Sequence, residues 1–98
     1  MDKESVLRQF RTIPSIGKAC ALDLWAIGLR SIADLKGQNP AALYHKLNVV
    51  TGAQHDICML YTFRCAVYYA TEPNPDREKL NWWYWKDKEY NESGEVSR

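Results

Sequence analysis

Residues 10–25 read Phe-Arg-Thr-Ile-Pro-Ser-Ile-Gly-Lys-Ala-Cys-Ala-Leu-Asp-Leu-Trp. Pro14 fixes its own φ and has no backbone N–H, so it ends a helix that arrives from the N-terminal side. We expect Ile16 to point inward and to anchor the turn to a core. Gly17 is expected to supply a backbone geometry and a close approach that a Cβ would obstruct. The stretch therefore predicts two helices joined by a tight turn.

The start of the second of these helices is a predicted anion site. Its first N–H groups have no partners within the helix, and the helix dipole is positive at this end, which suits phosphate. Lys18 adds a positive charge beside them. Such a site contacts the DNA backbone and does not read bases, so we expect binding without sequence specificity.

This stretch resembles the helix-hairpin-helix pattern. The matching positions are Ile13, Pro14, Ile16, Gly17 and Ala21. Ser15 stands where the pattern usually has its first glycine. If that position needs a positive φ, serine costs about 1 kcal/mol relative to glycine. The Ser15 hydroxyl is then expected to cap the helix or to contact phosphate.

Residues 28–35 (Gly-Leu-Arg-Ser-Ile-Ala-Asp-Leu) resemble a degenerate second hairpin of the kind that commonly follows the first. They would place Arg30 and Ser31 at another helix N-terminus. The predicted DNA-binding residues are therefore Ser15, Ile16, Gly17, Lys18, Arg30 and Ser31.

The rest of the pattern predicts an all-α fold, a compact bundle of five or six short helices that contains the helix-hairpin-helix (SAM-like) element. The expected helices span residues 5–10, 17–27, 31–36, 41–50, 57–70 and a last stretch that starts at 74. Asn39 and Asp56 are the expected N-caps of the fourth and fifth helices. Because Asp23 is the only charged residue between Lys18 and Arg30, we expect the second helix to be central and buried.

Ninety-eight residues suggest a single domain, assigned to residues 1–87. It divides into a helix-hairpin-helix core (5–52) and C-terminal helices (56–86). Residues 88–98 lack apolar periodicity and are predicted to be a disordered tail.

The amino-acid composition excludes few classes of binding partner. The net charge is +1, with +3 on residues 1–50 and −2 on residues 51–98. No apolar run approaches the roughly 20 residues that span a bilayer, so we expect no membrane partner. Three cysteines, an odd number without CxxC spacing, fit a reducing compartment and a cytoplasmic location.

We expect no enzymatic activity, no cofactor and no metal site. His55, Cys58 and Cys65 invite a zinc hypothesis, but about 10 Å of helical rise separates the two cysteines and a fourth ligand is missing. Buried structural cysteines are the better interpretation. No nucleophile comes with an orienting group and an oxyanion site.

Two further features of the sequence each have two possible interpretations. Arg64 is expected to pair with a carboxylate of Asp56, Asp76 or Asp87, although it would also suit a phosphate. The aromatic residues at 82–85 are expected to cover the core, with a stacking platform for unpaired bases as the alternative. Adjacent Trp82 and Trp83 cannot both face inward, so at least one should be partly exposed.

Residues 55–68 and 75–87 extend the resemblance through the run Phe-Arg-Cys-Ala-Val-Tyr at 63–68 and the tryptophan cluster. Together with the hairpin, over residues 10–87, they resemble the bacterial pathogenicity-locus family of helix-hairpin-helix proteins, whose members are often labelled mitomycin resistance proteins. The resemblance implies a link to DNA repair or mitomycin resistance and attaches no enzymatic activity. We therefore expect weak, non-sequence-specific DNA binding. A protein-interaction or dimerisation module, with a second copy or another protein as its partner, is the alternative.

Overall fold

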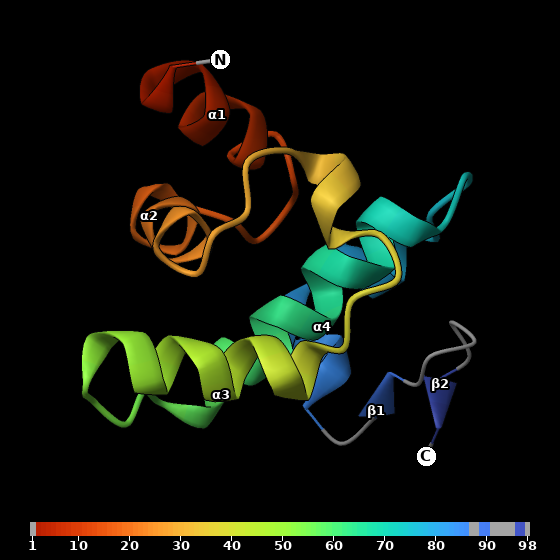
Figure 1. The fold of residues 1–98 in the computed structure, drawn as a ribbon. Helices are drawn as coiled ribbons and strands as arrows, with labels where there is room; N and C mark the ends of the chain where they lie inside the picture. The colour runs from red at the N-terminus through yellow and green to blue at the C-terminus, as the bar shows by residue number, and fades with distance from the viewer. Residues whose placement is uncertain (1, 87–88, 91–95, 98) are drawn as a thin grey trace.

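The structure, a computed structural model, describes residues 2–86, 89–90 and 96–97. In these residues there are four α-helices and three 3-10 helices (Figure 1). The α-helices are α1 (Lys3–Phe10), α2 (Lys18–Ala26), α3 (Pro40–Thr51) and α4 (Ile57–Thr71). The 3-10 helices are η1 (Ile32–Leu35), η2 (Arg77–Leu80) and η3 (Trp82–Trp85). The two-residue strands β1 (Glu89–Tyr90) and β2 (Val96–Ser97) pair antiparallel.

The predicted all-α class and the compact shape are confirmed. The radius of gyration is 12.3 Å, close to the ~13 Å expected of a folded chain of this length. The predicted five or six helices become four α-helices among the described residues, because the third and sixth predicted helices form 3-10 turns.

Side-chain caps set the helix ends, as the sequence predicted. The Asn39 side chain accepts hydrogen bonds from two amides at the start of α3, and Asp56 accepts one from Cys58 at the start of α4. At the other end of α3, Gly52 has a φ of +68°, the left-handed conformation that commonly ends a helix. These bonds are local in the chain, which explains why the sequence revealed them.

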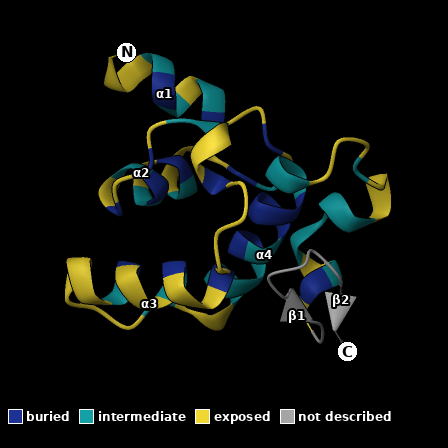
Figure 2. Ribbon diagram, turned by 45° about the vertical axis from the view of Figure 1, so that its right-hand side comes forward, coloured by how far each residue is buried: buried dark blue, intermediate teal, exposed yellow. Residues whose placement is uncertain are grey.

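The central helix is α4, and the prediction that residues 17–27 form the buried centre is wrong. η1, α3, η2 and η3 all pack against α4. The α4 residues that are buried are Thr62, Phe63, Cys65, Ala66, Val67 and Tyr68. In contrast, α2 buries only Ala21 and Leu24 and leaves Leu22 39% exposed. The outer face of α2 carries small residues such as Ala19 and Ala26, which stay exposed at little cost. Figure 2 shows the burial of α4 beside the exposed face of α3.

The last predicted helix is broken at Asn81, whose extended backbone (φ −99°, ψ 129°) separates η2 from η3. The break frees two carbonyl groups that a continuous α-helix would use. The Lys79 carbonyl instead accepts from the Trp85 indole N–H at 2.9 Å, and the Leu80 carbonyl accepts from the Ser15 hydroxyl. Partners from the folded core thus replace the helical hydrogen bonds.

The break lets the tryptophans face different ways. The Trp85 side chain is fully buried and packs against the Tyr68 ring, with centroids 5.4 Å apart. Trp83 is 59% exposed, which confirms that adjacent Trp82 and Trp83 do not both face inward. Arg64 donates to the Trp85 carbonyl oxygen at 2.9 Å and lies over the Tyr61 ring.

Of the three carboxylates predicted as partners of Arg64, Asp87 lies outside the described residues. Asp56 and Asp76 both accept hydrogen bonds from backbone amides at the start of a helix. Most of the predicted tail, 88–98, also lies outside the described residues, and its disorder stays a prediction. Within residues 2–86, 89–90 and 96–97, no helix has the length and apolar character to cross a membrane.

We expect Trp85→Phe to lower the free energy of unfolding by about 2–3 kcal/mol, because it removes buried volume and the indole N–H that donates to the Lys79 carbonyl. The matched control is Trp83→Phe, an exposed position in the same 3-10 helix, which should change stability by less than about 0.5 kcal/mol. Urea unfolding followed by circular dichroism measures both. Equal effects would contradict this assignment of the two rings.

Candidate nucleic-acid interface

The turn between α1 and α2 is held by the core on its inner side. The Ile13 amide donates to the Phe10 carbonyl and the Ile16 amide to the Ile13 carbonyl, at 3.0 and 3.1 Å. Both isoleucine side chains are buried, at 1% and 5% exposure. The prediction that Ile16 anchors the turn is therefore confirmed, and its side chain points away from solvent.

Ser15 has a φ of +76°, the left-handed conformation expected for the first glycine of the pattern. Its hydroxyl donates to the Leu80 carbonyl at 2.9 Å and accepts from the Trp82 amide at 3.1 Å. We call this pair of hydrogen bonds the Ser15 bridge. The hydroxyl does not cap α2, because both of these hydrogen bonds tie the turn to the backbone between η2 and η3.

Gly17 precedes α2 in an extended conformation (φ −95°, ψ −170°) that any residue adopts. A Cβ at this position would meet no other atom within 4 Å. The predicted need for glycine geometry inside the fold is therefore wrong. Gly17 instead leaves the helix end open to solvent, since it has no side chain to lie over it.

The first turn of α2 is not capped by any side chain of the described residues. Its first internal hydrogen bond runs from the Ala21 amide to the Gly17 carbonyl at 3.0 Å. The amides of residues 18–20 precede that bond, so they stand at the positive end of the helix dipole.

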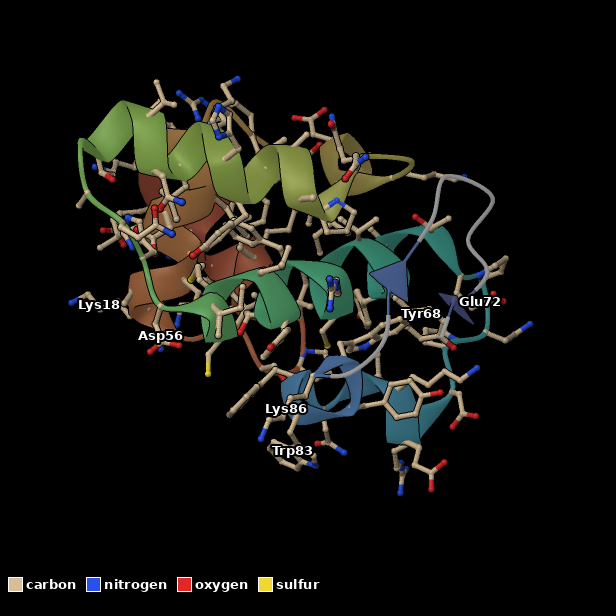
Figure 3. The ribbon with its side chains drawn as sticks, turned by 90° about the horizontal axis from the view of Figure 1, so that it is seen from below. Lys18, Asp56, Tyr68, Glu72, Trp83 and Lys86 are labelled. Atoms are coloured by element: carbon tan, nitrogen blue, oxygen red, sulfur yellow. The ribbon has the colours of Figure 1, made fainter. Side chains whose placement is uncertain are left out.

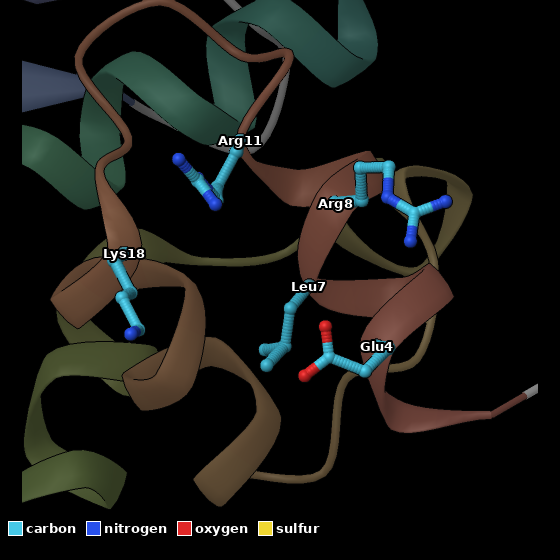
Figure 4. A pocket seen from close by; sticks show the side chains of 5 residues that line it. All are labelled: Glu4, Leu7, Arg8, Arg11 and Lys18. Carbon is cyan, nitrogen blue, oxygen red and sulfur yellow. The ribbon is translucent and has the colours of Figure 1, made fainter.

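A small cavity of about 160 Å³ opens beside this helix end, between α1 and α2. Its lining residues are Glu4, Leu7, Arg8, Arg11 and Lys18. Three cations against one carboxylate leave a formal excess of two positive charges. Figure 4 shows Arg11 and Lys18 on the two sides of the turn, whereas the Arg8 guanidinium points outward from α1. We call Arg8, Arg11 and Lys18 the basic cluster.

Arg30 and Ser31 lie at the other end of α2, roughly 12 Å away along the helix axis. The Arg30 guanidinium stacks on Trp25, with its Cζ 3.6 Å from the ring centroid, and donates to the carbonyl oxygens of Trp25 and Leu29. Ser31 caps η1 by accepting from the Asp34 amide. The structure does not bring these two residues together with Lys18.

The sequence interpretation missed Arg8 and Arg11. A signal for them was present, because both arginines come within seven residues before Pro14, close to the predicted turn. Lys18 follows the turn, so cations flank it on both sides.

The predicted burial of the cysteines is confirmed for Cys65 but not for Cys58, which is only half-buried. Cys65 is fully buried in α4, and its thiol lies 3.9 Å from the Pro14 carbonyl and 3.8 Å from the Lys79 carbonyl. Burial raises the pKa of the Cys65 thiol to about 11. Cys20 and Cys58 are half-buried. In the part of the chain that the structure describes, no three His, Cys, Asp or Glu side chains gather as metal ligands would.

Comparison of the amino-acid sequence with known proteins identifies the family. The sequence profile described as "Pathogenicity locus" matches residues 3–91, nearly the whole chain. The chain belongs to the pathogenicity-locus family. It is also similar to the mitomycin resistance protein McrB of Streptomyces lavendulae, with 32% identity over 74 residues that cover 76% of this chain and 67% of the relative. No solved structure matches the chain significantly.

For this pathogenicity-locus protein we expect Ser15→Ala to lower the free energy of unfolding by about 2 kcal/mol, because both bonds of the Ser15 bridge disappear while the positive φ stays strained. Ser15→Gly loses the same bonds but relieves the strain, so its loss should be about 1 kcal/mol smaller. Urea unfolding of the two variants tests the ranking. A glycine variant less stable than the alanine variant would contradict it.

Stability should fall in alkali through Cys65. The thiol ionises near its ordinary pKa of 9.0 in the unfolded chain but only near 11 when folded, so the unfolded state binds fewer protons between these values. The free energy of unfolding therefore decreases as pH rises through this window. Between pH 9 and 10 the decrease should be about 1 kcal/mol larger than in Cys65→Ala, measured by urea unfolding under reducing conditions. Identical slopes would show that the thiol is not protected by the fold.

Proposed function

We propose that this pathogenicity-locus protein binds DNA weakly and without sequence specificity, through a helix-hairpin-helix formed by α1, residues 11–17 and α2. The uncapped N-terminus of α2 beside the basic cluster is the observation that supports the proposal most strongly. Amides and cations there would contact phosphate oxygens, which carry the same chemistry at every nucleotide. The proposal assigns no catalytic step and no cofactor.

The proposed contact surface differs from the residue set expected from sequence. Gly17 and Lys18 remain in it, and Arg8 and Arg11 join them. Ser15 and Ile16 support the turn from the inside, so only their backbone is near the proposed contact. We leave out Arg30 and Ser31, since their polar groups are engaged within the protein.

Two or three phosphate contacts give low affinity. Non-specific complexes of this kind have dissociation constants of about 10⁻⁴–10⁻⁶ M at physiological salt. A second copy, another module or a protein scaffold would raise the affinity, because linked sites bind together. We therefore propose that the protein works on DNA as part of an assembly.

The Streptomyces relative is named as a mitomycin resistance protein. A DNA-binding protein of the same family would fit a role in DNA repair, and this link belongs to the proposal. Survival of a deletion strain on mitomycin would show whether the phenotype extends to this chain.

An interaction module is the second candidate function. It is favoured by the apolar side chains at the end of α3 and the start of α4, where Val49, Val50 and Ile57 are 65%, 52% and 49% exposed. Such side chains gain free energy when a partner covers them. Light scattering of the isolated protein tests self-association through this surface.

The DNA proposal predicts salt-dependent binding of a labelled duplex, measured by fluorescence anisotropy at 20 and 200 mM salt. The slope of log K against log salt should be about −0.9 for each phosphate contact. Lys18→Ala and Arg11→Ala should each make this slope less steep by about 1.

Lys36→Ala is the charge-matched control, since Lys36 is exposed beyond η1 and outside the basic cluster. It should leave the slope unchanged. An absence of binding at 20 mM salt, or equal effects of Lys36→Ala and Lys18→Ala, would overturn the proposed function.

A further inference from the structure

Trp83 is an exposed aromatic side chain on a rigid base. The neighbouring backbone is fixed on both sides, because the Trp82 amide belongs to the Ser15 bridge and the Trp85 indole is buried and hydrogen-bonded. The rings of Trp82 and Trp83 meet edge to face, with centroids 5.8 Å apart and an interplanar angle of 81°. Trp83 is thus held in place although 59% of its surface faces solvent.

Lys86 lies on the same side of η3 as Trp83. In a 3-10 helix, residues three apart eclipse each other, and the Lys86 amide donates to the Trp83 carbonyl at 3.2 Å as this geometry requires. Figure 3 shows both side chains leaving the lower face of the molecule next to each other. An aromatic ring and a cation therefore project together from one turn.

The segment that carries this pair is hydrogen-bonded to the turn between α1 and α2. The Trp82 amide lies 3.1 Å from the Ser15 hydroxyl. Lys18 follows Ser15 by three residues, so their Cα atoms are at most about 11 Å apart. Figure 3 places Lys18 and Trp83 on adjacent sides of the molecule. The Ser15 bridge thus ties the segment that carries Trp83 to the turn that leads into Lys18.

We propose that Trp83 stacks on an unpaired base while Lys86 contacts a neighbouring phosphate, so that the preferred ligand is single-stranded DNA or DNA with unpaired bases. This inference rests on the proposed function and names its substrate class. Bases within a duplex already stack on each other and offer no free face to the indole, whereas those of a single strand do. Aromatic stacking is tolerant of sequence, which agrees with phosphate contacts that ignore base identity.

The test compares three labelled ligands at 20 mM salt by anisotropy: an oligothymidylate of about 12 nucleotides, an abasic strand of the same length, and a duplex. Trp83→Ala should weaken binding of the thymidylate about tenfold, whereas Trp83→Phe should keep most of the wild-type affinity. Duplex affinity should change less than twofold in both variants. The wild-type protein should bind the abasic strand as weakly as Trp83→Ala binds the thymidylate, because that strand keeps its phosphates and lacks bases.

Two results overturn the inference and leave the proposed function standing. One is an unchanged thymidylate affinity in Trp83→Ala, with Lys18→Ala still weakening both ligands. The other is self-association without DNA that Trp83→Ala abolishes, which would make this surface a contact between copies of the chain. Loss of every salt-dependent interaction, for duplex and single strand alike, overturns the proposed function itself.

Discussion

The packing of Trp85 against α4 is the contact on which the geometry of the proposed interface depends. The buried indole packs against the Tyr68 ring and donates a hydrogen bond to the Lys79 carbonyl. These two contacts fix the 3-10 helices η2 and η3 against the core. That segment in turn presents the Leu80 carbonyl and the Trp82 amide to Ser15. The turn between α1 and α2 is therefore positioned by residues about 65 places further along the chain.

This arrangement explains why a serine is accepted at a position with a positive φ. The strain of about 1 kcal/mol is offset by two hydrogen bonds that glycine could not make. The bridge also orients α2, whose open N-terminus faces the cavity beside Arg11 and Lys18. The core and the Ser15 bridge thus lie on one side of the turn, and the basic cluster, the proposed contact surface, lies on the other.

The same C-terminal segment carries the exposed Trp83 and holds the turn before the proposed phosphate contacts, so one structural unit connects the two proposed parts of the interface. Burial of Trp85 fixes the backbone next to Trp83. A Trp83 ring held in this way loses little conformational entropy when a base stacks on it. The low net charge of +1 fits this division, because stacking adds affinity that is independent of additional cations.

The sequence by itself determined the local features: the all-α class, the caps Asn39 and Asp56, the break at Pro14 and the partial exposure of the tryptophan pair. Each follows from hydrogen bonds or side-chain periodicity within a few residues, which the order of amino acids expresses directly. Tertiary structure alone decided that α4 is central, that the last helix breaks at Asn81, and that Lys18 lines one cavity with Arg11 and not with Arg30. These outcomes depend on contacts between distant segments, such as Ser15 with Leu80, whose free energies no local pattern contains.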